Sequence, residues 1–167
     1  IIAYILQPGD AGYVAGITKG LIAAPTDQSS GAKFGCQGQP LAGAAGTAVG
    51  DGLQNTIDIQ AGCAVVGTCA DIASNLVLGG YSDWFVPSSG EIVLLYQNIG
   101  PGNALGLGNI GNFASADYWT SNKGDNLGAF QCVFGSGGTI NTDYRDALQY
   151  LRATRLSTIT SSSTSCS

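Results

Sequence analysis

The stretch YSDWFVPSSGEIVLLYQN, residues 81–98, constrains the fold more than any other part of the sequence. Ser88 and Glu91 have the spacing of a capping box, in which the serine oxygen accepts the N–H of the third helical residue and the glutamate reaches back. The apolar residues that follow recur on one helical face. Pro87 biases the residue before it towards an extended conformation. We therefore expect an extended segment anchored in a core, followed by a short helix that ends near Asn98.

The rest of the chain predicts two more helices and several short strands. Helical signals occur at residues 51–62 and 69–78, with Asp51 and Thr68 as their caps. Strand signals occur at residues 1–6, 20–24, 117–121, 128–135 and 148–155. Residues 25–50 and 100–115 are expected to be loops. The sequence thus predicts an α+β fold with few helices plus a small antiparallel sheet with long irregular loops.

Length and composition indicate one folded domain. The chain has 167 residues, enough to bury roughly 70% of its unfolded surface. Apolar residues make up 44% of it and charged residues 10%, a balance that argues against disorder. We expect the domain to span residues 1–156 and a Ser/Thr-rich polar tail to span 157–167. Because the chain starts abruptly in IIAYILQ, we expect a C-terminal piece of a longer secreted or cell-surface protein.

The charge pattern excludes some partners. The net charge is −5, and no block of Lys or Arg occurs, so duplex nucleic acid is not an expected partner. No run of 18 apolar residues is present, so we expect no insertion into a membrane.

The five cysteines predict disulfide chemistry and not metal binding. Their spacing forms no C-x-x-C pair, and the chain has no histidine, so a zinc site is poorly supported. An oxidising compartment is the better interpretation, with one thiol left over. Cys63 and Cys69 are close enough to close a small loop, and Cys36 is a rival partner for either of them. A catalytic thiol is not expected, since it normally needs a histidine partner.

Oxygen ligands and paired carboxylates offer little support for catalysis. The one glutamate is expected to be occupied in capping, and no spacing demands that either Asp143 with Asp146 or Asp117 with Asp125 act as an acid–base pair. We therefore expect no enzyme activity and no cofactor. Calcium is a lesser alternative, with two candidate oxygen sets: Asn122, Asp125 and Asn126, or Asn141, Asp143 and Asp146.

Four ordered segments resemble one known family. The succession GGYSDWFVPSSGEIVLLYQN, YWTSN, AFQCVFGSGG and LRATR is similar to the bacterial extracellular domain family typified by the C-terminal domain of the Legionella collagen-like adhesin, Lcl. The matching positions are Trp84, Pro87, Ser88, Glu91, Tyr118, Trp119, Phe134, Gly135, Arg152 and Arg155. Conservative departures occur at Val86, Ile92 and Thr120. The segments GLIAAPTDQSSGAKFGC and AVGDGLQNT extend the resemblance over nearly the whole chain.

The resemblance implies a fold and a function. It implies a C-type-lectin-like fold at the end of a collagen-like stalk, and because such stalks are three-stranded, a homotrimer. Proteins of this kind are implicated in attachment to sulphated glycosaminoglycans of the host or matrix and in clumping or biofilm formation. We therefore expect an extracellular adhesin head domain that binds sulphated polysaccharides.

Binding a sulphated polymer requires clustered basic side chains, because guanidinium groups suit sulphate as they suit phosphate. The candidate ligand-binding residues are Lys123, Arg145, Arg152 and Arg155. Lys123 and Arg145 have loop-like surroundings and are expected to be exposed. Arg152 and Arg155 lie in a terminal strand, where pairing with internal aspartates is an equal alternative. In a trimer each position occurs three times, so a local basic patch can attract a polyanion despite the net charge.

Two other functions stay open. The first is a structural trimerisation cap, which holds a stalk in register without a specific glycan. The second is a binder of neutral sugars or peptides that uses exposed aromatic residues, with Tyr13, Tyr144 and Tyr150 as candidates. Salt-sensitive binding that weakens on substitution of Lys123 or Arg145 by alanine distinguishes the adhesin from both.

Overall fold

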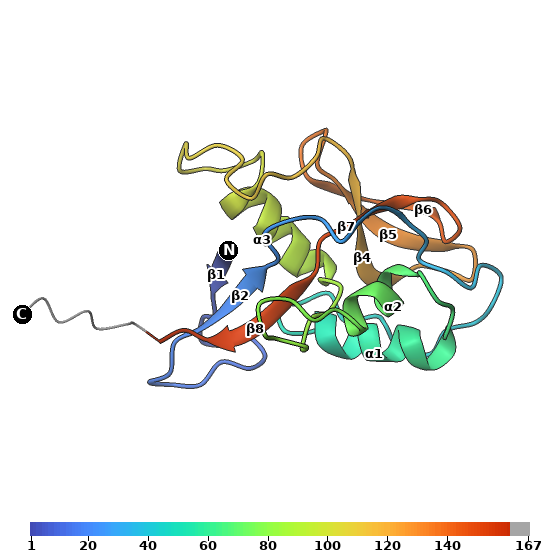
Figure 1. The fold of residues 1–167 in the computed structure, drawn as a ribbon, viewed down its shortest axis with the longest axis horizontal. Helices are drawn as coiled ribbons and strands as arrows, with labels where there is room; N and C mark the ends of the chain where they lie inside the picture. Colours follow the sequence, from blue (N-terminus) through green and yellow to red (C-terminus); the bar gives the residue numbers. More distant parts are fainter. Residues whose placement is uncertain (161–167) are drawn as a thin grey trace, which may run out of the picture.

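The computed structural model describes residues 1–160 (Figure 1). In chain order the elements are β1 (Ile2–Ile5), β2 (Lys19–Ala23), β3 (Ser29–Ala32), α1 (Gly52–Gly62), α2 (Cys69–Ser74), α3 (Ser89–Ile99), β4 (Asp117–Lys123), β5 (Gly128–Val133), β6 (Thr139–Tyr144), β7 (Gln149–Leu151) and β8 (Thr154–Thr158). The predicted α+β class is confirmed. Most of the expected 157–167 tail lies outside the described residues, and its first two residues end β8.

The strands form two sheets and not the single one expected. β1, β2 and β8 make an antiparallel three-stranded sheet, in which the first strands of the domain pair with the last one. The other five strands follow the order β3-β7-β4-β5-β6, with β4 and β7 parallel and the other neighbours antiparallel. Figure 1 shows α3 between the two sheets, with α1 and α2 beside the larger one.

The predicted capping box at the start of α3 is confirmed. The Ser88 hydroxyl accepts the N–H of Glu91 at 3.3 Å, and the Glu91 carboxylate accepts the N–H of Ser88 at 2.7 Å. The helix ends at Ile99, one residue beyond the predicted end. Both capping residues are fully buried, so the cap is also a contact between the helix and the rest of the core.

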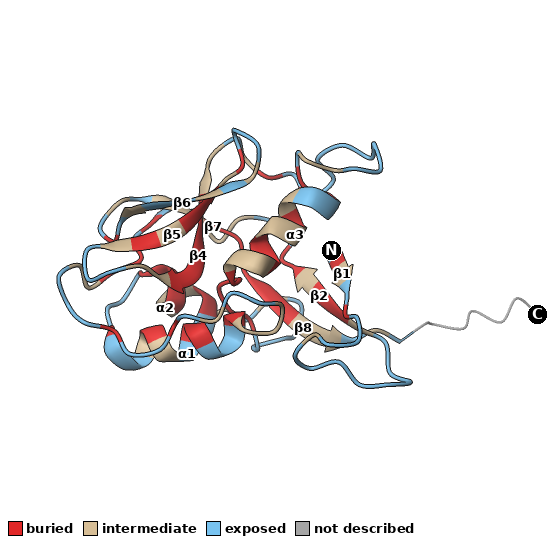
Figure 2. Cartoon of the chain, turned by 180° about the vertical axis from the view of Figure 1, so that it is seen from behind, coloured by how far each residue is buried: buried red, intermediate tan, exposed pale blue. Residues whose placement is uncertain are grey.

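Two apolar clusters lie on opposite faces of the larger sheet. Trp119 and its neighbour Tyr118 are both fully buried on β4, and because successive side chains of a strand point to opposite faces, they enter different clusters. Trp119 packs with α1, α2 and Phe34, whereas Tyr118 packs with α3 and Phe134. Figure 2 shows β4 coloured as buried and the outer side of α1 as exposed.

The structure resolves the cysteine alternatives in favour of Cys36. Cys36 and Cys63 form a disulfide that spans 27 residues and ties the loop after β3 to the end of α1. Cys69 and Cys132 are buried as free thiols, and burial raises the pKa of each to about 12. Cys166 lies outside the described residues.

Several predicted boundaries are wrong, and β3 and β6 were not expected at all. β6 has the sequence TINTDY, whose polar side chains give no apolar alternation, since most of the strand is exposed. The single strand expected at 148–155 divides into β7 and β8, which belong to different sheets. The second helix begins after its predicted Thr68 cap but ends at Ser74, four residues before the predicted end. Within residues 1–160, no helix is both long and apolar enough to cross a membrane.

Candidate functional site

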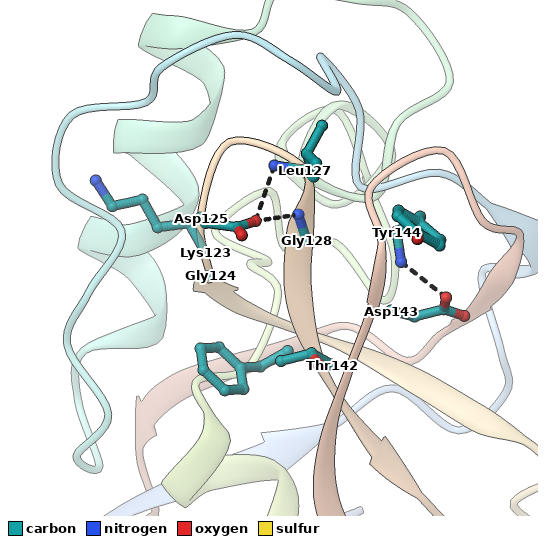
Figure 3. Close-up of a pocket in the computed structure, with 9 residues that line it drawn as sticks. Lys123, Gly124, Asp125, Leu127, Gly128, Thr142, Asp143 and Tyr144 are labelled. Atoms are coloured by element: carbon teal, nitrogen blue, oxygen red, sulfur yellow. Dashed lines mark hydrogen bonds between the residues drawn. The ribbon is translucent and has the colours of Figure 1, made fainter.

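A pocket of about 780 Å³ lies over the ends of β4, β5 and β6 (Figure 3). Its lining residues are Lys123, Gly124, Asp125, Leu127, Gly128, Phe130, Thr142, Asp143 and Tyr144. In the β5–β6 register, Phe130 lies opposite Thr142 and Gly128 lies opposite Tyr144. Because Gly128 has no side chain to cover its exposed partner, the tyrosine stands beside an open space on the sheet.

The carboxylate of Asp125 is fixed at the rim of this pocket by its own loop. Its Oδ1 accepts the backbone N–H of Leu127 at 2.9 Å and that of Gly128 at 2.7 Å, as Figure 3 shows. These hydrogen bonds lower the pKa of Asp125, so its side chain is ionised at neutral pH. The other oxygen, Oδ2, has no hydrogen-bond partner among residues 1–160 and is free to accept one from a ligand.

The second carboxylate of the pocket is already engaged. Asp143 accepts the N–H of Tyr144 at 2.7 Å through Oδ1 and the side-chain amide of Gln149 at 2.7 Å through Oδ2. It therefore holds the end of β6 in place. Asp125 is left as the principal acceptor, with Tyr144 and Phe130 as aromatic surfaces and Thr142 as a hydroxyl.

Lys123, a predicted polyanion ligand, is at the pocket but is directed away from its centre. Its ammonium group donates to the carbonyl of Leu41, and Figure 3 shows the side chain extending to the side opposite Asp143 and Tyr144. The half-buried Lys123 is the one predicted ligand that the structure leaves partly accessible. It does not neutralise Asp125 through an ion pair in the described part of the chain.

Arg145 was expected to be exposed, and this expectation is wrong. The residue follows β6 in a turn, but its side chain is 0% exposed. The guanidinium donates to the carbonyls of Gln39 at 2.8 Å and Asp125 at 2.5 Å, with longer contacts to those of Cys36 and Gly128. Backbone carbonyls have no signature in a sequence, so nothing there showed that this arginine points inward.

Arg152 and Arg155 are also buried, and each pairs with an aspartate of the domain instead of facing a ligand. Arg152 is 1% exposed, and its Nε donates to Asp27 at 2.8 Å. Arg155 donates to both oxygens of Asp83, at 2.7 and 3.0 Å, and stacks on the Tyr81 ring 3.6 Å from its centroid. The structure therefore does not gather the four predicted basic residues into one exposed patch.

The first of the two calcium ligand sets does not assemble in the structure. The amide of Asn122 is committed to the N–H of Ser89 and the carbonyl of Gly46, so it does not join Asp125 in a calcium site. In residues 1–160, no group of three or more His, Cys, Asp or Glu side chains is arranged to hold a metal ion. Burial raises the pKa of Glu91, whose carboxylate is occupied in capping.

The pocket was only partly foreseen from the sequence. Asp125 was considered as a calcium ligand or a paired carboxylate, and Tyr144 as an exposed aromatic, but nothing brought the two together. Thr142 was missed because β6 was missed. The signal that could have found them is the pair of polar hairpin turns around the GAFQCV strand.

A second pocket, of about 450 Å³, lies beside the three-stranded sheet. It is lined mainly by apolar residues, among them Ile1, Ile22 and Leu78, and Arg155 borders it.

No protein-family model matches this chain, and no curated protein matches it either.

Proposed function

We propose that the chain is an extracellular glycan-binding head domain, of the adhesin kind to which its motifs are similar, and that the pocket at Asp125 is its sugar site. The observation that carries the proposal is the grouping of one ionised, half-satisfied carboxylate with two aromatic side chains on a rigid sheet. Sugars present apolar C–H faces to aromatic rings and hydroxyl donors to carboxylates. A binding role without catalysis and a C-type-lectin-like arrangement of the fold belong to the same proposal.

The extracellular part of the proposal is supported by the disulfide. Cys36–Cys63 is compatible with an oxidising location, where structural disulfides form and persist. The low charge of the chain agrees with this, because solubility then comes from neutral polar groups.

The pocket favours neutral or amine-bearing sugars over sulphated ones. Three of the four basic residues predicted to bind sulphate are buried, and the charge directed at the ligand space comes from Asp125. An ammonium group can pair with the free Oδ2 of Asp125, whereas a sulphate is repelled by it. Binding of sulphated glycosaminoglycans belongs to the same proposal, and of the four predicted basic residues only Lys123 can contribute to it.

The test is a binding series with the 167-residue chain on immobilised glucosamine oligosaccharides, N-acetylglucosamine oligosaccharides and heparin, at low and physiological salt. We expect binding to one or both of the first two and its loss in Asp125→Asn. Heparin binding that falls with salt and is lost in Lys123→Ala would support the sulphated ligand instead. If none of the three binds, the glycan proposal is wrong.

A second candidate function is self-association, as in a trimerisation cap. It is favoured by a group of exposed apolar side chains at the start of the domain: Ile1, Ile2, Ile5, Tyr13, Val14 and Ile17. Burial of such a surface in a symmetric contact removes apolar area from water and so favours association. The mass of the chain in solution tests it, because a monomer at high concentration would exclude this function.

A further inference from the structure

The wall of the pocket at Asp125 is held from behind by one buried arginine. Arg145 is fully buried, and among the described residues no carboxylate forms an ion pair with it. Its guanidinium is bound instead by backbone carbonyls from two loops, Asp125 and Gly128 in front and Cys36 and Gln39 behind. Its own backbone N–H donates to Leu127 at 2.8 Å. Arg145 therefore joins the pocket loop 124–128 to the loop 35–39.

Further contacts join the loop 35–39 to the pocket loop at residue 126 and to the turn at residues 145–146. The N–H of Gly38 donates to the carbonyl of Asn126 at 2.7 Å, and the N–H of Gly35 donates to the carbonyl of Arg145 at 3.0 Å. The side chain of Gln37 accepts the N–H of Asp146 at 3.1 Å. Gly38 thus contacts the pocket loop directly, whereas Gly35 and Gln37 contact the turn that carries Arg145.

The loop 35–39 is itself held in an unusual conformation by the disulfide. Cys36 has a φ of 49°, a left-handed value that costs a non-glycine residue about 1 kcal/mol or more and persists only where surrounding contacts fix it. The bond to Cys63 anchors Cys36 to the end of α1, and the carbonyl of Cys36 then faces Arg145. Cys36 is half-buried and Cys63 is buried, so a reductant approaches the bond from the Cys36 side.

We propose that Arg145 is a positioning residue for the pocket and that the Cys36–Cys63 disulfide acts through it, so that the pocket wall is ordered when the disulfide is closed and loosens when it opens. Opening proceeds by thiol–disulfide exchange with a dithiol reductant. The S–S bond breaks, and the two cysteines take up two electrons and two protons and become thiols. The dithiol reductant is oxidised to a disulfide. The consequence for ligand affinity rests on the proposed glycan site, whereas the loosening of the wall does not.

The physical basis is the cost of a buried charge without its acceptors. Arg145 needs several carbonyls at once, because a guanidinium out of water is tolerated only when its N–H groups are bonded. When Cys36 leaves its left-handed conformation, the acceptors behind the arginine move with it. The arginine then draws water towards loop 124–128, and the surface hydrogen bonds from the loop amides to Asp125 open more often.

The experiment compares wild type, Cys36→Ala/Cys63→Ala and Arg145→Lys by hydrogen exchange and by NMR titration of the Asp125 carboxyl. We expect the amides of Leu127 and Gly128 to exchange about tenfold faster in both variants, as in a local opening. Because those amides hold the pKa of Asp125 below its ordinary value, that pKa should rise in both variants. The lysine tests the arginine alone, since one ammonium group cannot reach four carbonyls.

Ile92→Val, in the cluster on the other face of the sheet, is the control for general loss of stability. If it speeds exchange at Leu127 and Gly128 as much as the other variants do, the effect is global and the proposal is wrong. Unchanged exchange and titration in Arg145→Lys overturn the proposal as well, even if the double cysteine variant does not fold. Absence of glycan binding by wild type would overturn the proposed function and leave these measurements unaffected.

Discussion

Glu91 accepts a hydrogen bond from the backbone N–H of Gly50 at 2.8 Å, although 41 residues separate the two in the chain. The same carboxylate caps α3 through Ser88, so one buried side chain joins a helix start to the loop before α1. We expect Glu91→Gln to lower the free energy of unfolding by about 1–3 kcal/mol, because its amide NH₂ turns a donor towards a buried N–H. Urea denaturation measures this, with the exposed Gln97→Ala on the same helix as control. Equal stability of the two variants would contradict this account.

Arg152 should behave as a core residue and not as a ligand-binding one. Its guanidinium bonds Asp27 and the carbonyls of Ala24 and Gly111. Removing one partner of a buried pair leaves the other uncompensated, so we expect Arg152→Ala to cost about 3–5 kcal/mol in unfolding free energy. The exposed Lys33→Ala should cost under about 0.5 kcal/mol. A well-folded Arg152→Ala that loses only ligand binding would restore the role predicted from sequence.

The ion pair between Asp83 and Arg155 predicts a dependence of stability on acid. The hydrogen bond from Arg155 lowers the pKa of Asp83 below its ordinary value of 3.8. The folded state therefore binds this proton more weakly than the unfolded state does, so the stabilisation is complete above pH 3.8 and is lost as the pH falls through the lower, folded pKa. Because the Asp83 side chain is 51% exposed, solvent limits the effect to about 0.5 kcal/mol.

Thermal melts of wild type and Asp83→Asn between pH 2 and 6 measure that contribution. The difference between the two proteins should be present at pH 6 and vanish at the acid end. Asp146→Asn is the matched control, because Asp146 is exposed and forms no ion pair in the described part of the chain. A difference that grows towards low pH would contradict the assigned sign.

The disulfide should contribute strongly to global stability. The closed loop spans 27 residues, and loss of its constraint on the unfolded chain is worth about 3–4 kcal/mol. We therefore expect guanidinium denaturation of Cys36→Ala/Cys63→Ala to show a lower midpoint than wild type and a free energy of unfolding that is smaller by that amount. Cys132→Ala, which removes a buried free thiol, is the control for loss of a small buried side chain. A midpoint shift no larger than that of the control would show that the cross-link is energetically minor.

Tyr144 should contribute to ligand binding without affecting the fold. Its ring is 63% exposed at the pocket, opposite Gly128. Loss of an aromatic contact of about 1 kcal/mol lowers affinity about fivefold, so Tyr144→Ala should weaken binding of the glycan found in the series above by that factor. Tyr13→Ala removes another exposed tyrosine, away from this pocket, and should not change affinity. Equal loss in both variants would exclude a local role for Tyr144.

Features set by local chemistry could be predicted from the sequence, whereas those set by distant contacts could not. The Ser88–Glu91 cap and the Thr68 cap depend on residues three apart, and both are confirmed. Asp51 stands at the start of α1 as predicted, but its side chain forms no capping hydrogen bond. β6 has little apolar signal because it forms a sheet edge, and it exists through pairing with β5. Arg145 was misplaced for a related reason, since its acceptors are carbonyls up to 109 residues away. The pocket as a whole was missed with β6, because three of its five polar side chains come from that strand.

Because Arg145, Arg152 and Arg155 are buried, the positive charge on the surface of the domain comes from lysines alone, and that surface carries the net charge of −5 as aspartates. Asp27 and Asp83 are paired with Arg152 and Arg155, and Glu91 is inside, so three lysines stand against the eight other aspartates. Repulsion of an anionic surface extends over about a Debye length, ~8 Å at physiological ionic strength. Encounter with such a surface is therefore slowed before any contact forms. The rate of association with it should rise as salt is added, opposite to the behaviour of a protein that captures polyanions by charge.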